Sequence, residues 1–396
     1  MSRTALVIGG GIAGPATAMA LRKAGIEAVV HEARAEGDGD AGVFLTLGSN
    51  GIEALKAIDA DRRATATGFA TPELTLRGSK GRTLGVSKIS SATAAPSMTI
   101  RRADLYRALH EEAVRRGVQV VHGKRLVSAE DTGDAVTATF ADGTTATGDL
   151  LIGCDGVHST VRRAVDPGAP APSYAGLISL GGYARGVDTG AEPGSYTMIF
   201  GRRAFFGYAV APDGEVWWFA NVPRPAEPAR GEVERIPADE WRRTLAGVFA
   251  DDAGPAVPIL EATATADIMP ASPVHLLKRL PAWHRGRMIA VGDAAHAPSP
   301  SSGQGASLAI EDAVVLARCL RDAPSHAEAY PDFVRRRRPR VEKIVKQAAR
   351  INNSKAAGPV GRLFLDAFMP LFLRAAARSS FTEEVYGHRT TWEVAA

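Results

Sequence analysis

Cysteine is scarce in this sequence, and its scarcity excludes several classes of protein. Cys154 and Cys319 are the two cysteines among 396 residues. Because two cysteines so far apart cannot form a disulfide framework, we expect a protein of a reducing compartment, the cytoplasm. No C-x-x-C or H-E-x-x-H spacing occurs, so we also expect no structural or catalytic metal ion.

Long apolar runs are missing as well. The nearest approach to one, residues 360–376, is interrupted by Arg362, Asp366 and Pro370. We interpret this stretch as one or two amphipathic helices that pack on the protein itself or on a second subunit. We therefore expect no integral membrane segment.

Neither sign of charge is in large excess. The formal net charge is +4, and the positive residues are scattered along the chain, which argues against a nucleic-acid partner. The densest basic run, residues 335–338 followed by Pro339 and Arg340, lies in a helix-like stretch. We interpret this run as a solvent-exposed helix face.

Three further motifs are missing. No G-x-S-x-G sequence occurs, which argues against a serine hydrolase. The Gly-rich loop at residues 292–306 has neither the spacing nor the lysine of a P-loop. A second G-x-G-x-x-G that directly follows a buried strand and opens a helix is also missing, which argues against a second nucleotide-binding domain.

The N-terminal segment carries a complete dinucleotide-binding pattern. Residues 5–8 form the continuous apolar run of a parallel strand buried on both faces. A helix follows, and a second strand at residues 27–31 delivers Glu32. In such a unit the glycines let the backbone approach a pyrophosphate, and the acid accepts hydrogen bonds from a ribose. The glycines of the motif are Gly9, Gly11 and Gly14.

Two later strands of the same buried type also end in glycine-containing loops. One ends at Asp155-Gly156 and the other at Gly292-Asp293, and each loop precedes a helix. Ligands collect at the carboxyl ends of parallel strands, so the three loops can surround one long ligand. Free backbone N–H groups at the start of the last helix, near Ala306, favour an anion or an electron-rich group there.

The middle of the chain has a different character. From about residue 167, short aromatic-rich strands and prolines replace the helical pattern, with a hairpin turn at residues 212–215. This pattern predicts a mostly antiparallel sheet in a layer of its own.

The order of these motifs resembles that of the para-hydroxybenzoate hydroxylase family, the single-component class A FAD monooxygenases, from residue 4 to about residue 340. The resemblance implies an α/β protein with a Rossmann-like FAD-binding domain (GR2/PHBH-type), an inserted, mostly antiparallel β-sheet substrate domain and C-terminal helices. We place the discontinuous FAD-binding domain at residues 1–70, 97–166 and 284–340, the substrate-binding domain at 71–96 and 167–283, and a helical tail at 341–396.

The resemblance also implies roles for individual residues. Arg102 matches the arginine that reaches the cofactor, Asp293 would bind the ribityl chain, and Pro300 falls beside the isoalloxazine. Ser159 and Arg162 also stand in matching places. We interpret His296 as orienting its loop rather than as a base. The predicted cofactor-binding residues are Gly9, Gly11, Ile12, Ala13, Gly14, Glu32, Ala33, Arg34, Arg102, Asp155, Gly156, Asp293, Pro300, Gly303, Gly305 and Ala306.

The activity implied is hydroxylation of an aromatic or polycyclic small molecule. NADPH or NADH reduces FAD, O2 adds at C4a, and the hydroperoxide transfers oxygen, so no obligatory catalytic side chain is expected. The substrate pocket should lie between the flavin and the aromatic sheet, whose alternate residues face opposite ways. From Phe205, Phe206, Tyr208, Trp217, Trp218 and Phe219, we select as pocket candidates Phe206, Tyr208 and Trp218. We expect a monomer or a homodimer.

Two alternatives remain at this stage. A flavin-dependent halogenase would usually carry a Trp-x-Trp motif and a catalytic lysine, whereas Trp217 and Trp218 are adjacent. A flavin-binding protein without turnover is the other alternative, and the intact cofactor loops argue against it.

Overall fold

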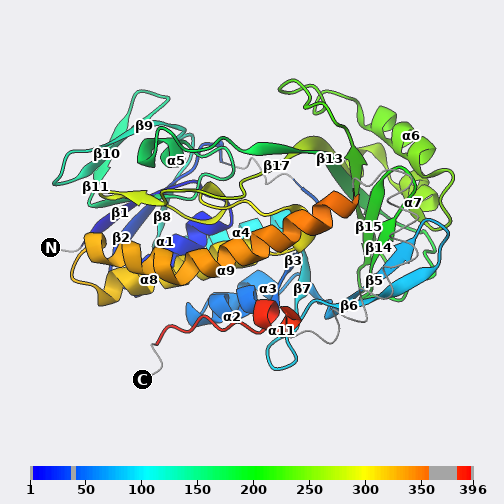
Figure 1. Cartoon of the computed structure of the whole chain (residues 1–396), viewed down its shortest axis with the longest axis horizontal. Helices are drawn as coiled ribbons and strands as arrows, with labels where there is room; N and C mark the ends of the chain where they lie inside the picture. Colours follow the sequence, from blue (N-terminus) through cyan, green and yellow to red (C-terminus); the bar gives the residue numbers. More distant parts are fainter. Residues whose placement is uncertain (1–2, 37–41, 356–380, 394–396) are drawn as a thin grey trace.

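The computed structural model describes residues 3–36, 42–355 and 381–393, except for the side chains of residues 301 and 349–355. The chain forms two lobes (Figure 1). One lobe holds a mainly parallel sheet with helices packed around it, and the other holds a larger, mostly antiparallel sheet. The predicted α/β class is therefore confirmed, and the domain boundaries given above stay predictions. The amphipathic stretch predicted at residues 360–376 lies outside the described residues.

The first sheet has six strands in the order β18-β19-β12-β1-β2-β8. Its central strand β1 runs parallel to β12 and β2, which flank it. The carboxyl ends of β1, β12 and β19 therefore meet at one edge. The strands are β1 (Thr4–Ile8), β2 (Glu27–His31), β8 (Gln119–Val121), β12 (Leu150–Gly153), β18 (His284–Arg285) and β19 (Met288–Ala290).

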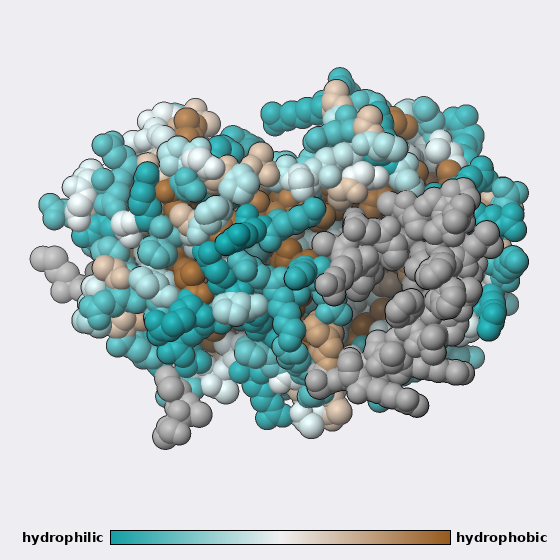
Figure 2. Space-filling view, in the orientation of Figure 1, coloured by the Kyte–Doolittle hydropathy of each residue, from teal (hydrophilic) through white to brown (hydrophobic). Residues whose placement is uncertain are grey.

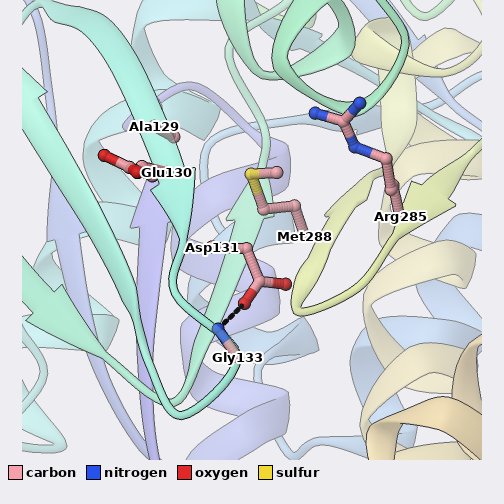
Figure 3. A pocket seen from close by; sticks show the side chains of 6 residues that line it. All are labelled: Ala129, Glu130, Asp131, Gly133, Arg285 and Met288. Atoms are coloured by element: carbon pink, nitrogen blue, oxygen red, sulfur yellow. Dashed lines mark hydrogen bonds between the residues drawn. The ribbon is translucent and has the colours of Figure 1, made fainter.

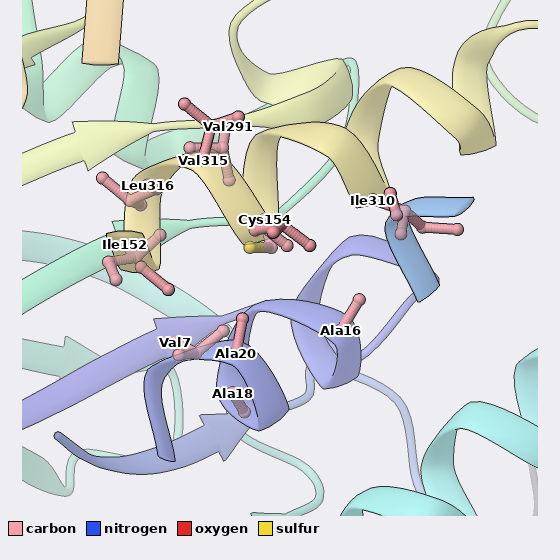
Figure 4. Packing of buried hydrophobic residues seen from close by; sticks show 14 of the residues in the cluster. Val7, Ala16, Ala18, Ala20, Ile152, Cys154, Val291, Ile310, Val315 and Leu316 are labelled. Carbon is pink, nitrogen blue, oxygen red and sulfur yellow. The ribbon is translucent and has the colours of Figure 1, made fainter. Parts of the chain in front are cut away.

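Small side chains bring helices close to this sheet. Helix α1 (Ala13–Lys23) buries Ala16, Ala18 and Ala20, and helix α8 (Gly305–Asp322) packs against it. Figure 4 shows both helices converging on Val7, Ile152 and Cys154. Cys154 contacts Thr17 and is buried among these groups. Its burial raises the pKa of its thiol to about 12.

The second sheet has seven strands in the order β17-β13-β16-β15-β14-β5-β6. Every pair in it is antiparallel except β14 with β5, so the predicted mostly antiparallel sheet is present. The strands are β5 (Glu73–Gly78), β6 (Thr83–Lys88), β13 (Ser173–Ala184), β14 (Tyr196–Phe200), β15 (Phe205–Val210), β16 (Val216–Pro223) and β17 (Ile268–Leu276). Helices α6 (Ala238–Phe249) and α7 (Ala256–Ala262) cover its outer face (Figure 1).

Two three-stranded sheets and several helices complete the described chain. One small sheet contains β3 (Phe44–Leu47), β7 (Met98–Arg101) and β4 (Phe69–Ala70), and the other contains β9 (Leu126–Asp131), β10 (Val136–Phe140) and β11 (Thr145–Gly148). The remaining helices are α2 (Ser49–Ala57), α3 (Asp61–Thr65), α4 (Arg102–Arg115), α5 (Thr160–Val165), α9 (His326–Lys355) and α11 (Phe381–Tyr386). Short 3-10 turns occur at Thr265–Asp267, Gly292–Ala294 and Pro300–Ser302.

The surface carries both hydrophilic and hydrophobic residues. Figure 2 shows a face covered mainly by hydrophilic residues, with hydrophobic residues in small separate patches. Among the helices that the structure describes, none is long and apolar enough to cross a membrane. The described residues also hold no group of three His, Cys, Asp or Glu side chains placed to bind a metal ion.

A shallow pocket of about 430 Å³ lies between the β9–β10 hairpin and the turn that joins β18 to β19. Figure 3 shows Asp131 accepting a hydrogen bond from the backbone N–H of Gly133 at 2.9 Å, with Arg285 on the far side. None of the predicted cofactor residues lines this pocket, so we assign it no role in the site.

Helices α8 and α9 are joined by a buried network of charges. Arg337 lies 2.6 Å from Glu311 and 2.7 Å from Asp312, and all three side chains are at most 2% exposed. Arg340 adds a second cation, 2.7 Å from Glu311. Burial by itself would raise the pKa of Glu311, but the charges of Arg337 and Arg340 outweigh burial and hold that pKa well below its usual range.

This network corrects the interpretation of residues 335–340 as a solvent-exposed face. Arg335 and Arg336 are exposed and pair with Asp332, as expected of a surface. Arg337, in contrast, is buried and faces α8. Residues three or four apart share one side of a helix, so Arg337 and Arg340 face α8 together while Arg335 and Arg336 point outward.

Replacing Arg337 tests the network. We expect Arg337→Met to lower the free energy of unfolding by about 3–5 kcal/mol, because two carboxylates lose a buried partner. Arg335→Met removes the same charge from a side chain that is 73% exposed, and it should cost less than about 1 kcal/mol. Urea unfolding followed by circular dichroism measures both variants. Equal losses would show that the buried pair contributes no more than the exposed one.

Candidate active site

The first loop has the geometry that a pyrophosphate requires. A side chain at Gly9 would meet the Cys154 carbonyl oxygen at 2.4 Å, and one at Gly14 would meet the Gly9 carbonyl oxygen at 1.9 Å. These glycines therefore let β1, β12 and α1 pack closely. A side chain at Gly11, in contrast, would enter space with no heavy atom within 4 Å. Helix α1 has no side-chain cap at Ile12, so its first N–H groups remain available to an anion.

Glu32 ties this loop to the end of β2. Its carboxylate accepts hydrogen bonds from the backbone N–H of Gly10 at 2.5 Å and from that of Arg34 at 2.8 Å. The side chain of His110, from α4, bonds the Gly10 carbonyl oxygen on the other side. Each carboxylate oxygen still has a lone pair for a ribose hydroxyl. A cavity of about 660 Å³ lined by His110 and His122 adjoins this end of the loop.

The acid of the second loop, Asp155, caps a helix. Asp155 accepts hydrogen bonds from Ser159 Oγ and from the backbone N–H of Thr160 and Val161, so its side chain caps α5. Burial raises the pKa of Asp155, and these hydrogen bonds oppose the rise. A direct contact between this carboxylate and a cofactor stays a prediction, and the backbone of Asp155-Gly156 is the part most available for it.

Arg162 joins the second loop to the third. Its guanidinium is buried and donates to the carbonyl oxygens of Val157, at 2.8 Å, and Ala294, at 3.1 Å. The sequence placed Arg162 in a matching position of the family without a role. The structure shows that it holds the Asp-Gly and Gly-Asp loops at a fixed separation.

The third loop presents Asp293 to an enclosed space. The side chain of Asp293 is exposed, yet protein surrounds it, and this enclosure raises its pKa against the opposing charges of His296 and Arg102. A side chain at Gly305 would lie 3.8 Å from its carboxylate. The space beside Asp293 is the position expected for the sugar alcohol of a flavin.

The start of α8 follows this loop. Gly303 has a positive φ of +60° and open space where a side chain would be, and the N-cap residue Gln304 makes no capping hydrogen bond. The N–H groups of Gly303 and Gln304 already donate to the Pro300 carbonyl oxygen, at 3.0 Å, and to Ser302 Oγ, at 3.1 Å. The helix can therefore offer those of Gly305 and Ala306, and their contact with a cofactor stays a prediction. His296 is buried, and its Nε2 lies 2.6 Å from Asp312, which supports its interpretation as a loop-orienting residue.

Two further features at this loop have a role in the site that was not expected from the sequence. Helix α2 also begins here without a side-chain cap, and the Gly48 N–H donates to Ser307 Oγ at 3.0 Å. Asn50 links Gln304, at 2.9 Å, to Glu311, at 2.6 Å. The sequence Gly48-Ser49-Asn50-Gly51 contains typical helix-start residues and could have indicated this second helix N-terminus.

The role of Tyr386 was not expected from the sequence either. It ends α11, and burial raises the pKa of its phenol to about 12. Tyr386 packs against both the core of the first lobe and the inner face of the large sheet. No local pattern indicates these contacts, because Tyr386 lies far along the chain from the elements that it packs against.

The pocket candidates on the large sheet require a correction. Phe206, Tyr208 and Trp218 are 0% exposed and lie in the core that the sheet forms with α6 and α7. Phe206 stacks on Trp218 at 5.6 Å and meets Phe249 of α6 at 5.2 Å. The three alternate residues, Phe205, Trp217 and Phe219, point to the other face. Trp217 and Phe219 meet Phe44 of the first lobe there, and Phe205 meets Phe219. Phe205 and Trp217 are also buried, at 1% and 4% exposed, and Phe219 is partly exposed.

Two glycine variants separate packing from ligand binding. Gly14→Ala should lower the stability of the FAD-free protein, because its methyl group meets backbone. Gly11→Ala should leave that stability unchanged and raise the Kd for FAD by about tenfold or more, because its methyl group occupies the open space. Quenching of FAD fluorescence measures affinity, and urea unfolding measures stability. Unchanged FAD affinity in Gly11→Ala would move the pyrophosphate elsewhere.

A second pair of variants tests which face of the large sheet is the closed core and which faces the first lobe. Phe206→Ala should lower the free energy of unfolding by about 3–5 kcal/mol, because it opens a cavity in a closed core. Phe219→Ala removes the same atoms from a partly exposed ring and should cost less than half as much. If chemical denaturation ranks the two variants in the opposite order, the assignment of the inner face is wrong.

Comparison with known proteins agrees with this geometry. A family profile described as an FAD binding domain matches residues 2–348. The chain is 33% identical over 320 residues to an aurachin C monooxygenase/isomerase of Stigmatella aurantiaca, covering 80% of each chain. It is 30% identical over 351 residues to an FAD-dependent urate hydroxylase of Klebsiella pneumoniae subsp. pneumoniae, covering 87% of this chain and 88% of that one.

Similarity extends to solved structures. The crystal structure of Klebsiella pneumoniae HpxO complexed with FAD and uric acid matches with a TM-score of 0.83 at 26% identity, covering 96% of this chain and 97% of that one. The predicted family and the predicted enzyme class, an FAD-dependent monooxygenase, are thereby confirmed. The chain belongs to the FAD-binding-domain family of para-hydroxybenzoate hydroxylase-like, class A flavoprotein monooxygenases.

Proposed function

We propose that this enzyme hydroxylates a planar, uncharged aromatic or polycyclic small molecule with O2 and a nicotinamide reductant. The observation that carries the proposal is the inner face of the large sheet. Its residues on β15 and β16 are Phe205, Gly207, Ala209, Trp217, Phe219 and Asn221. None of these is charged, and rings alternate with small residues, which suits a flat apolar ring.

The described residues fit FAD. Gly11 and the start of α1 would hold the pyrophosphate, Glu32 the adenosine ribose, and Asp293 the sugar alcohol. Backbone N–H groups at Gly305 and Ala306 would stabilise negative charge on the pyrimidine edge. When bound, FAD supplies the redox chemistry and the activation of O2.

The protein contributes position and exclusion of water. The aromatic face would orient the substrate ring. The ring of Phe44, whose centre lies 5.8 Å from that of Tyr196 and 5.8 Å from that of Phe219, would help to exclude water from it. Because burial raises the pKa of Tyr386 to about 12, its hydroxyl is protonated at neutral pH. It can therefore donate a hydrogen bond to a ring oxygen.

The substrate proposed here differs in charge from urate, which appears in the name of one relative. Urate is an anion, whereas the proposed substrate is uncharged. The cation nearest to the inner face, Arg101, is paired with buried Glu215. No charge on β15 or β16 would balance an anion in the centre of the face. Desolvating an unpaired anion there would be costly.

The proposal is tested with the purified holoenzyme. Oxidised-flavin absorption should be present and should bleach with NADH or NADPH under anaerobic conditions. In air, a panel of neutral bicyclic phenols and quinolones should accelerate nucleotide oxidation and give products that gain about 16 mass units. Urate should do neither. A halogenated product would favour the halogenase alternative, and a flavoprotein that no reductant bleaches would favour a binding protein.

A further inference from the structure

Two arginines meet one carboxylate where the two lobes touch. Arg101 ends β7 in the first lobe, and the next residue, Arg102, begins α4. Arg185 directly follows β13 of the large sheet, and Glu215 directly precedes β16, which pairs with β13 at Ala184 and Val216. This cluster of Arg101, Arg185 and Glu215 therefore has members from both lobes.

The cluster adjoins the point of contact between the lobes. The carbonyl oxygen of Val43 accepts a hydrogen bond from Tyr183 of β13, at 2.8 Å, and another from the Arg102 N–H, at 3.0 Å. Tyr183 also covers Arg101, whose guanidinium carbon lies 4.6 Å from its ring centre. The cluster is thus within one residue of the arginine predicted to reach FAD.

The two arginines of the cluster share one carboxylate. Glu215 is 5% exposed and accepts hydrogen bonds from Arg101, from Arg185 Nε at 2.9 Å and from Trp217 Nε1 at 2.8 Å. Asp213 lies beside it and accepts from the Glu215 N–H at 3.1 Å, so the cluster offers a ligand guanidinium N–H donors rather than an excess of charge. Each guanidinium has five N–H donors, and Glu215 engages only some of them.

The two cations are held in place and remain accessible. Tyr183 and Trp217 enclose the guanidinium of Arg101, with centres at 4.6 and 5.1 Å. Yet 34% of the Arg101 side chain and 80% of the Arg185 side chain are exposed. Planar guanidinium groups that are fixed and accessible suit a phosphate, which they can bind through two parallel hydrogen bonds.

We propose that the cluster of Arg101, Arg185 and Glu215 docks the diphosphate of the nicotinamide reductant, NADH or NADPH, during its visit to the flavin. This inference rests on the proposed function, which requires such a reductant. The pyrophosphate of FAD has its own place at Gly11 and the start of α1, and the aromatic face accounts for an uncharged substrate. The cluster lies next to Arg102 in the chain and is assigned to neither of these ligands.

The solvent exposure of the cluster suits a nucleotide that must dissociate after it has reduced the flavin. A contact between an exposed arginine and a phosphate is screened by salt and contributes little affinity. The reductant would therefore bind weakly and exchange rapidly, while FAD stays held by its buried loops.

The test compares Arg185→Gln with Arg202→Gln in the FAD-loaded enzyme. Arg202 is also exposed, and it lies in the turn between β14 and β15, at the opposite end of the sheet from Glu215. Anaerobic stopped-flow absorbance measures flavin reduction at increasing NADH and, separately, NADPH. Dithionite serves as a reductant that needs no docking site, and the Kd for FAD is measured in parallel.

We expect Arg185→Gln to raise the half-saturating nucleotide concentration by about three- to tenfold. The limiting rate, dithionite reduction and FAD affinity should not change, and added salt should weaken the wild-type enzyme more than the variant. Arg202→Gln should match the wild type. The nucleotide affected identifies the reductant.

Three outcomes would overturn the docking site. Half-saturation in Arg185→Gln that equals that of Arg202→Gln removes the cluster from reductant binding, with the proposed function intact. Weakened FAD binding in Arg185→Gln assigns the cluster to the flavin instead. If dithionite but neither nucleotide reduces the wild-type flavin, the nicotinamide reductant itself is wrong, and the proposed function fails together with the docking site.

Discussion

The hydrogen bonds and ion pairs of the Asp312 carboxylate are the interactions on which the site depends most. One of its oxygens accepts from the backbone N–H of Gly292 and lies 2.6 Å from His296, and the other accepts from Arg337. A single buried group therefore connects the end of β19, the loop before α8 and helix α9. Removing a carboxylate from water is costly unless every partner is present. The third loop consequently has one stable arrangement, in which Asp293 faces the enclosed space and α8 begins at Gly305.

The first loop was predictable from sequence because its geometry is local. Gly9, Gly14 and Glu32 act on backbone within one βαβ unit, so spacing alone indicates their positions. Asp155 was less predictable. Its motif places it correctly at the end of β12, but the orientation of its side chain depends on α5, whose first N–H groups compete for the same oxygens. The part taken by each of these residues in binding the cofactor stays a prediction.

The errors on the pocket candidates and on the basic run share one cause. Periodicity shows which residues share a face of a strand or helix, but not which neighbouring element that face packs against. Alternation on β15 and β16 separates Phe206 and Trp218 from Phe205 and Trp217, yet it does not say which set meets the other lobe. Only the position of α6 and α7 decides that question. Likewise, the helical pattern groups Arg337 with Arg340, and only the acids of α8 show that this side is buried. Tyr386 reaches the site through tertiary contacts that no local pattern encodes.

The burial of the cysteines has a consequence for the lifetime of the enzyme. Enzymes that activate O2 release some hydrogen peroxide, which oxidises thiolates far faster than thiols. Burial raises the pKa of Cys154 to about 12, and that of Cys319 to about 12 as well. Both sulfurs are therefore protonated at neutral pH, and Cys154 lies directly behind the glycine loop. Any peroxide released during turnover would therefore meet no thiolate at Cys154 or Cys319.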